Sequence, residues 1–228
     1  AALERLLDER VRLVCFPHCS NIVGEINPVA RIVATVRRAG AFACVDGVSY
    51  APHGLPDVGR LGADIYLLST YKTYGPHQGV MVVRRALAQR LPNQGHHFNA
   101  RILHKRLAPA GPDHAQVAAT AGIADYIDAL YARHSRAGRD ATARAGVVHD
   151  LMRGHETRLL APLLDYLGTR RDRVRLIGPA LAAERAPTVA LVHARPGAEL
   201  AAALAGHGVM AGGGAFYADR AVAALGVD

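Results

Sequence analysis

Short apolar runs alternate with a helical pattern through the first third of the chain. Three runs have the length of one strand each: VRLVCFP, AFACVDG and ADIYLLS. Because these runs are apolar throughout rather than alternately, we expect strands that are covered on both faces. Between the first two, NPVARIVATVRRAG has apolar residues at helical spacing, with Asn27 as the expected N-cap. This alternation predicts an α/β fold with a mostly parallel sheet, covering helices and right-handed crossovers.

The pattern changes after the third strand. The run GVMVVRR follows closely enough to form a fourth, antiparallel strand. From about residue 95 the chain is rich in polar and turn residues, which indicates a long irregular connection. Alanine-rich helical segments are expected at about 115–134 and 140–161, and a small α+β region at the end.

This order of elements predicts two domains. Residues 1–134 are expected to form part of a large α/β domain with its connecting segment, and residues 135–228 a small C-terminal α+β domain. A sheet does not usually begin with one isolated helix and strand, and AVAALGVD ends in the middle of a predicted domain. We therefore expect both domains to be incomplete in this chain.

Charge and cysteine content restrict the partners and the compartment. The formal net charge is +8, but basic residues occur singly or in pairs, without a basic and aromatic motif, so we expect no nucleic-acid partner. An arginine-rich surface or an anionic ligand accounts for the charge. We expect free, buried thiols in a reducing compartment at Cys15, Cys19 and Cys44. No apolar run has membrane-spanning length, so we expect a cytoplasmic protein without a membrane partner.

Lysine is rare in this chain. Of the 27 basic residues only Lys72 and Lys105 are lysines, and Lys72 follows directly after a predicted strand. An amine can lose its proton and attack a carbonyl, whereas a guanidinium stays charged. Lys72 is therefore a candidate for covalent chemistry, and the alternative is an ordinary exposed lysine in a loop.

Polar side chains follow the ends of all three predicted parallel strands. These candidates are Asn21 with His18 and Ser20, then Asp46 with Ser49 and His53, then Ser69, Tyr71 and Lys72. Because the carboxyl ends of parallel strands meet at one edge of a sheet, we expect the three sets to converge there. An amine, a carboxylate and hydroxyls suit pyridoxal 5'-phosphate, since the amine forms a Schiff base and the carboxylate keeps the ring nitrogen protonated.

The same residues carry a family resemblance. From HCSNIVGEINPVARI through VDGVSYAPHGLPDVGRLGADIYLLSTYKTYGPHQGVMVV, the chain resembles the class V aminotransferase and cysteine desulfurase group of fold type I pyridoxal-phosphate enzymes. Ser-Asn before a glycine, Val-Asp-Gly, a histidine, Asp-Val and Ser-x-x-Lys-x-x-Gly-Pro occur in the order of that group. Later stretches such as GGGAFYADRAVAALGVD look like its cysteine desulfurase-like members. The likeness spans nearly the whole chain but only the later part of a family member.

The resemblance implies roles for three residues near the cofactor ring. Lys72 resembles the Schiff-base lysine, which also moves protons at the substrate α-carbon. Asp46 matches the partner of the pyridinium nitrogen. Asn21 matches the asparagine near the ring oxygen and the substrate carboxylate.

Four further positions follow from the same resemblance. Ser69 matches a phosphate-binding serine, and Tyr71 stands where desulfurases usually have a phosphate-binding histidine. Ser49 stands where they usually have a glutamine that contacts the ring oxygen, and His53 matches a histidine that supports the site from outside it. The resemblance also implies a homodimer, and no metal site is expected.

Each residue also has an ordinary structural interpretation. Asp46 could be a turn aspartate, Ser69 and Asn21 could be helix caps, Tyr71 could pack against the edge of the core, and His53 could be a loop histidine.

The reaction stays open between three hypotheses. The first is transamination or elimination on a small amino acid or amine. The second is a true cysteine desulfurase or selenocysteine lyase, although no cysteine follows Cys44 and Tyr217 stands near the place of the persulfide cysteine. The third is a non-catalytic protein that keeps the fold, against which Lys72 and Asp46 argue.

Overall fold

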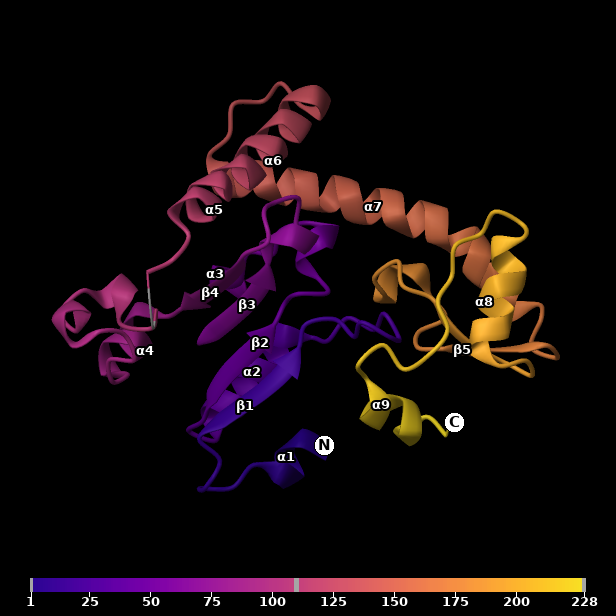
Figure 1. Ribbon diagram of the computed structural model, residues 1–228, viewed down its shortest axis with the longest axis horizontal. Coiled ribbons are helices and arrows are strands. Elements are labelled where there is room, and N and C mark those ends of the chain that lie inside the picture. The colour runs from indigo at the N-terminus through magenta and orange to yellow at the C-terminus, as the bar shows by residue number, and fades with distance from the viewer. Residues whose placement is uncertain (1, 109–110, 227–228) are drawn as a thin grey trace. The chain divides into compact units, whose positions relative to one another are not determined.

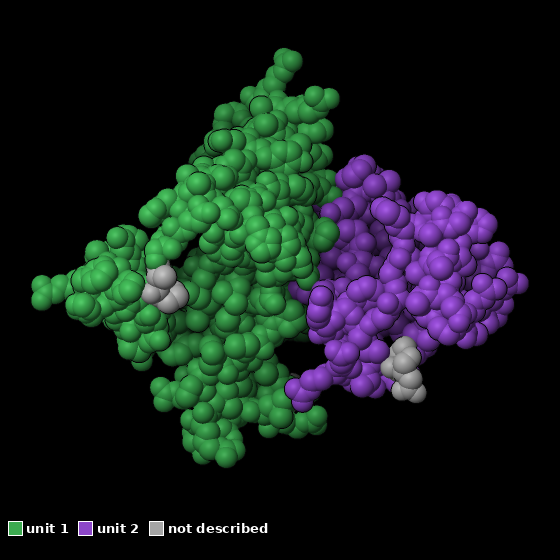
Figure 2. Space-filling view, in the orientation of Figure 1, with its two compact units in different colours: residues 1–18, 27–152 green, residues 19–26, 153–228 purple. Residues whose placement is uncertain are grey.

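The chain folds into two compact units. A computed structural model describes residues 2–108 and 111–226. Unit 1 comprises residues 1–18 and 27–152, and unit 2 comprises residues 19–26 and 153–228 (Figure 2). The predicted boundary between domains, after residue 134, lies inside unit 1. The division into two domains stays a prediction.

Unit 1 is built on a four-stranded sheet (Figure 1). The strands lie in chain order: β1 (Leu13–Pro17), β2 (Phe42–Asp46), β3 (Ile65–Ser69) and β4 (Gly79–Val83). Neighbouring strands from β1 to β3 pair in parallel, and β3 pairs with β4 antiparallel. The predicted α/β fold with a mostly parallel sheet is confirmed, including the antiparallel fourth strand.

Helix α2 (Val29–Arg38) covers one face of this sheet. Its apolar stripe and the strand residues beneath it form one core, whose buried members are Val29, Val33, Val36, Ala41, Ala43, Val45, Ala63 and Tyr66. The other face of β1 is open, because Leu13, Cys15 and Pro17 are exposed. The prediction that both faces of the strands are covered is therefore wrong for β1, of which only one face is covered.

The start of α2 differs from the prediction. The helix begins at Val29 after Pro28, and no side chain caps it. Asn27, the predicted N-cap, instead donates its side-chain amide to the carbonyl of Pro17 at 2.8 Å. The expected cap is therefore wrong, because the amide is used to tie the loop to the end of β1.

The remaining helices of unit 1 are short except for two. They are α1 (Ala2–Leu6), α3 (Val58–Leu61), α4 (Arg85–Arg90), α5 (His114–Ala119), α6 (Ala121–His134) and α7 (Ala141–Gly168). The 3₁₀ turns are η1 (Ala51–His53), η2 (Thr70–Lys72), η3 (His97–Asn99) and η4 (Leu103–Lys105). Both predicted alanine-rich segments are helical, and α7 runs on into unit 2.

No helix in residues 2–108 and 111–226 is long and apolar enough to span a membrane.

Unit 2 is a small α+β structure. It contains the end of α7, the antiparallel pair β5 (Val174–Ile177) and β6 (Ala190–His193), η5 (Ala182–Glu184), α8 (Gly197–Ala205) and α9 (Asp219–Ala224). Leu160, Leu164 and Ala182 form its buried core. Strands and helices thus occur together here, as expected for the small α+β region at the end of the chain.

Arg185 joins the short segment 19–26 to the rest of unit 2. Its side chain is fully buried, and its guanidinium donates to the carbonyls of Val23 at 3.0 Å and Thr188 at 2.7 Å. Gly24 packs so closely that a Cβ there would come within 2.7 Å of the Thr188 carbonyl, and its φ of +71° also favours glycine. These contacts make segment 19–26 part of unit 2.

Candidate functional site

The carboxyl ends of β1, β2 and β3 meet at one edge of the sheet in unit 1. Asp46, the last residue of β2, is the register partner of Leu67 on β3. The His18 backbone N–H donates to the Asp46 carbonyl at 2.7 Å, and the Gly47 N–H donates to the Leu67 carbonyl at 2.7 Å. Backbone hydrogen bonds therefore hold the residue after β1 to the end of β2, and the residue after β2 to β3.

Asp46 and Ser69 lie on the face of the sheet opposite α2. Successive residues of a strand point to opposite faces. Val45 and Tyr66 are buried in the core beneath α2. Asp46 and its partner Leu67 therefore point away from that helix, as does Ser69, two residues after Leu67. The edge thus carries a carboxylate and a hydroxyl on the same face.

The Asp46 carboxylate is exposed and only partly engaged. Its Oδ1 atom accepts a hydrogen bond from the Val48 N–H at 2.9 Å, which closes the turn after β2. Among the described residues, no group donates to Oδ2. Asp46 is therefore a turn aspartate through its Oδ1 atom, as the ordinary structural interpretation expects. Its Oδ2 atom is open to a ligand. Ser49 lies three residues after Asp46, in the same turn.

Lys72 is presented by a rigid turn. It is the last residue of η2, and its side chain is exposed. The threonines on either side, Thr70 and Thr73, are 1% and 0% exposed. The Thr70 hydroxyl donates to the Gln78 carbonyl at 2.8 Å, and the Thr73 hydroxyl to the Ser69 carbonyl at 2.9 Å. Buried threonines thus fix the backbone on both sides while the amine faces outward.

Tyr71 lies beside this amine. Its ring stacks on His77 with centroids 4.7 Å apart and planes 11° apart, and the Lys72 Nζ atom lies 5.8 Å from the Tyr71 centroid. Tyr71 is 49% exposed, so about half of its side chain is accessible to a ligand. Ser69 directly precedes η2 but makes no capping hydrogen bond. The Ser69 hydroxyl, three residues before Lys72, and the half-exposed phenol of Tyr71 thus precede the lysine in the chain.

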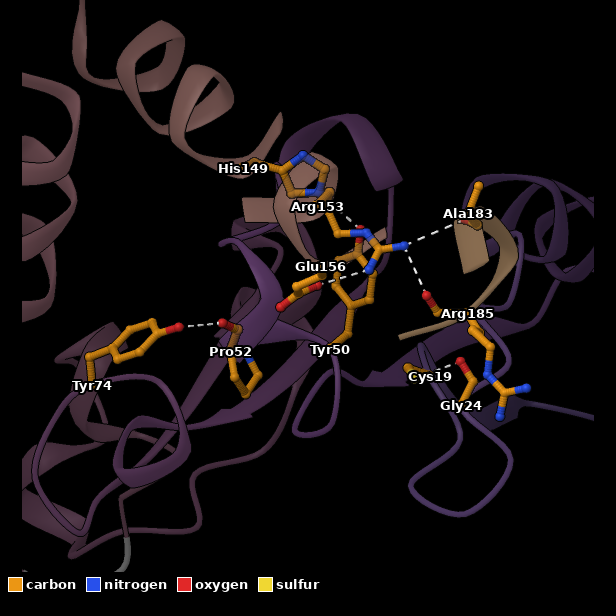
Figure 3. A network of polar contacts seen from close by, with 10 residues as sticks. All are labelled: Cys19, Gly24, Tyr50, Pro52, Tyr74, His149, Arg153, Glu156, Ala183 and Arg185. Carbon is orange, nitrogen blue, oxygen red and sulfur yellow. Dashed lines mark hydrogen bonds and ion pairs between the residues drawn. The ribbon is translucent and has the colours of Figure 1, made fainter. Parts of the chain in front are cut away.

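The turn after Lys72 is tied to the turn that contains His53. Tyr74 has a φ of +65°, which is rare for a residue with a side chain, and its hydroxyl donates to the Pro52 carbonyl at 2.7 Å (Figure 3). His53 follows Pro52 in η1 and is half-buried. This hydrogen bond links the segment after β2 to the segment after β3.

Asn21 belongs to unit 2. It is exposed in the segment 19–26, and its side-chain amide donates to the Phe216 carbonyl at 3.1 Å. Its interpretation as a helix cap is therefore wrong. The next residue, Tyr217, is fully exposed, and both Phe216 and Tyr217 have positive φ values, 48° and 64°. Asn21 thus holds a strained aromatic turn within its own unit.

Beneath the Asp46 turn lies a buried polar group that the sequence did not reveal. His18 is 5% exposed, and its Nδ1 atom is 2.9 Å from the hydroxyl of Tyr66, which is fully buried. The ring of Tyr50 stacks on His18 with centroids 3.7 Å apart. Burial, and to a smaller extent the charge of His149, lower the pKa of His18 to about 4. His18 is therefore neutral near pH 7.

All three cysteines are free, as predicted, but the prediction that they are buried is wrong for Cys15, and Cys19 and Cys44 are weak nucleophiles. Cys19 is buried, and burial raises the pKa of its thiol to about 11. Burial also raises the pKa of Cys44 to about 11, with a further contribution from the neighbouring Cys15 thiol. Cys15 itself is exposed. A thiol with such a high pKa carries little thiolate at neutral pH.

Known proteins share both the sequence and the fold. A family described as "Aminotransferase class-V" matches residues 1–227. "Aminotransferase-like protein FGM3" of Gibberella zeae is 47% identical over 98 residues, which are 42% of this chain and 24% of that protein. "Probable cysteine desulfurase 2" of Mycobacterium leprae is 30% identical over 198 residues, which are 82% of this chain and 43% of that protein. The chain thus spans less than half the length of these relatives.

The fold agrees with that of solved enzymes. The crystal structure of the cysteine desulfurase CsdA from Escherichia coli is similar with a TM-score of 0.73 and 22% identity, over 99% of this chain and 54% of that chain. An apo cysteine desulfurase from Thermococcus onnurineus has a TM-score of 0.69 over 99% of this chain and 55% of that one. On these matches, the chain belongs to the class V aminotransferase family, whose members are pyridoxal-phosphate-dependent enzymes.

Proposed function

We propose that this chain carries the lysine half of a pyridoxal-phosphate site that acts on a small amino acid or amine. One observation carries the proposal. Lys72 follows β3 and Asp46 ends β2, and these strands pair in parallel so that both residues lie at the same sheet edge. An amine and a carboxylate at this edge are the two groups that the cofactor requires from its protein.

The donor set fits the cofactor. Lys72 is exposed on a rigid turn, and its amine is free to bond to the cofactor aldehyde. The open Oδ2 atom of Asp46 is available to the ring nitrogen, and Ser69 and Tyr71 beside the lysine are available to the phosphate. When bound, pyridoxal phosphate supplies an electron sink for a carbanion at the substrate α-carbon.

The protein groups then have distinct tasks. The Asp46 carboxylate would attract the proton of the ring nitrogen, and the Lys72 amine would take and return a proton at the substrate α-carbon. Ser49 is assigned to the ring oxygen, and His53 supports the turn after β2. The role of Asn21, which lies in unit 2, stays a prediction from the family resemblance. The enzyme is proposed to act as a homodimer in the cytoplasm.

Loading followed by covalent trapping tests the proposal. The full chain is incubated with pyridoxal 5'-phosphate, reduced with borohydride and digested, and the modified peptide is identified by mass spectrometry. We expect the label on Lys72 and its loss in Lys72→Ala. Lys105→Ala removes the only other lysine in the sequence and is the matched control, which keeps the label. Equal labelling of wild type and Lys72→Ala contradicts the proposal.

A cysteine desulfurase is the second candidate, because several relatives carry that name. The sequence has no cysteine after Cys44, and burial raises the thiol pKa of Cys19 and Cys44, so of the three cysteines only Cys15 offers an exposed thiol to carry a persulfide. Incubation of the loaded enzyme with cysteine separates the candidates. With dithiothreitol present to reduce the released sulfur, sulfide and alanine indicate desulfuration, whereas a keto acid formed together with pyridoxamine phosphate from an amino-acid panel indicates transamination.

A further inference from the structure

We propose that His18 and Tyr66 form a buried pair that positions Asp46 and Ser49 for the cofactor ring, from the face of the sheet opposite the carboxylate. The inference rests on the proposed function and extends it. His18 and Tyr66 are positioning residues, because they act through the turn 46–50 rather than through contact with the cofactor.

Tyr66 forms the floor of this turn. Its ring lies so close to Gly47 that a Cβ at position 47 would come within 2.2 Å of three Tyr66 atoms, including the hydroxyl oxygen. Only glycine fits there without displacement of the ring. The Tyr66 side chain is fully buried, so it has no room to move away. The position of the Tyr66 ring therefore determines how closely the Gly47 backbone can approach the core immediately after Asp46.

His18 connects this floor to Asp46 itself. Its Nδ1 atom and the Tyr66 hydroxyl are 2.9 Å apart, while its backbone N–H donates to the Asp46 carbonyl at 2.7 Å. Its own carbonyl accepts from the Asn27 N–H at 2.8 Å, which fixes His18 from the other side. One residue thus links the buried hydroxyl to the last peptide of β2.

The turn folds back over the same histidine. The Tyr50 N–H donates to the Gly47 carbonyl at 3.0 Å, and the Tyr50 ring stacks on His18 with planes 22° apart. The Tyr50 hydroxyl is 3.0 Å from the Nε2 atom of His149 on α7 (Figure 3). The turn is therefore held at both ends: Gly47 rests on Tyr66 and Tyr50 rests on His18.

This arrangement explains how an exposed carboxylate is held in place. Asp46 has one hydrogen bond at its side chain, from Val48, and none at Oδ2 among the described residues. Its orientation depends on the backbone beneath it, which the His18–Tyr66 pair fixes. Because burial keeps His18 neutral, the pair adds no positive charge that would compete with the cofactor for the carboxylate.

Removal of one hydroxyl tests the inference. Tyr66→Phe keeps the ring under Gly47 but leaves the buried His18 nitrogen without its partner. We expect a roughly tenfold rise in the Kd for pyridoxal 5'-phosphate and a shifted absorbance maximum of the Lys72-bound cofactor. The matched control is Tyr131→Phe, which removes another buried tyrosine hydroxyl in unit 1, bonded to the Ala137 carbonyl. The control is expected to keep the wild-type Kd and spectrum.

A second variant protects the test against misfolding. His18→Gln keeps a side chain able to bond to Tyr66 but removes the ring that stacks on Tyr50, and its effect on the Kd is expected to be smaller than that of Tyr66→Phe. If Tyr66→Phe folds and binds the cofactor with an unchanged Kd and spectrum, the inference is overturned. If Tyr66→Phe does not fold, an unchanged Kd and spectrum in a double variant His18→Phe/Tyr66→Phe that does fold overturns it.

Failure of the proposed function has a different signature. If borohydride trapping leaves Lys72 of the wild-type chain unlabelled, both proposals are rejected. Labelled Lys72 together with equal cofactor affinity in Tyr66→Phe rejects only the positioning role of the pair.

Discussion

The Oδ2 atom of Asp64 accepts a hydrogen bond from the Ala43 N–H at 2.9 Å, at the amino ends of the strands whose carboxyl ends carry the site. The Asp64 side chain is only 11% exposed and lies 3.6 Å from Arg84 Nε and 4.0 Å from Arg37. This carboxylate therefore joins β2 to the start of β3 and neutralises two arginines beside the sheet.

Replacement of Asp64 is expected to destabilise unit 1. Asp64→Ala leaves the Ala43 N–H without its partner and two arginines without a counter-charge. We expect the free energy of unfolding to fall by about 2 kcal/mol, measured by urea denaturation. Asp172→Ala is the control, since its pair with Arg173 is 73–75% exposed and should change stability very little. Equal stability of Asp64→Ala and wild type would show that the contact is not important.

Arg185 is expected to control the segment that carries Asn21. Arg185→Met removes the donor that satisfies the carbonyls of Val23, Ile177, Pro179 and Thr188 in a fully buried position. We expect a loss of about 3 kcal/mol or more. Faster hydrogen exchange at residues 19–26 should accompany it, because Val23 lies in that segment.

An exposed arginine provides the comparison. Arg175 donates to the Leu225 carbonyl at 3.3 Å on the surface of unit 2. Arg175→Met should leave both the stability and the exchange of residues 19–26 near wild type. Slow exchange at 19–26 in Arg185→Met would mean that other contacts hold the segment.

The sheet and the placement of Lys72 and Asp46 followed from local sequence. Short uninterrupted apolar runs are typical of strands in a parallel sheet, and their ends carry the polar residues. The order of strands then brings Asp46 beside Leu67. The arrangement at this edge needed no information beyond neighbouring residues and the preference for parallel pairing.

The support beneath the site depended on contacts between distant parts of the chain. His18 and Tyr66 are 48 residues apart, and Arg185 and Val23 are 162 residues apart, so no local pattern announces either pair. His18 was recognised only as a polar residue after a strand, whereas it is buried. Gly47 was the one available signal, since a glycine directly after a strand-end aspartate indicates a close approach of another group.

Acid should destabilise the folded chain through His18. Its pKa is about 4 when folded, against a usual 6.5, because burial disfavours the charged ring among Tyr50, Tyr66 and His149. Between these values the unfolded chain binds more protons, so stability is full above pH 6.5 and falls as the pH drops towards 4. The loss amounts to about 3 kcal/mol.

Denaturation at several pH values isolates this contribution. The stability difference between wild type and His18→Gln should shrink from pH 7 to pH 4, since glutamine does not titrate. His104→Gln, which alters an exposed histidine, should follow the wild-type pH profile. Parallel profiles for wild type and His18→Gln would contradict a depressed His18 pKa.

Asp46 should separate cofactor binding from stability. Asp46→Asn keeps the shape of the side chain but removes the charge that holds a proton on the cofactor's ring nitrogen. A hydrogen bond to a charged group contributes about 1.5–3 kcal/mol, so we expect the Kd for pyridoxal 5'-phosphate to rise on the order of 10- to 100-fold. The free energy of unfolding should change little, because the Asp46 side chain is exposed and makes one hydrogen bond. Asp125→Asn, at an exposed position on α6, is the control for charge alone and should bind the cofactor as wild type does. An Asp46→Asn protein that binds with wild-type affinity and spectrum would remove Asp46 from the site.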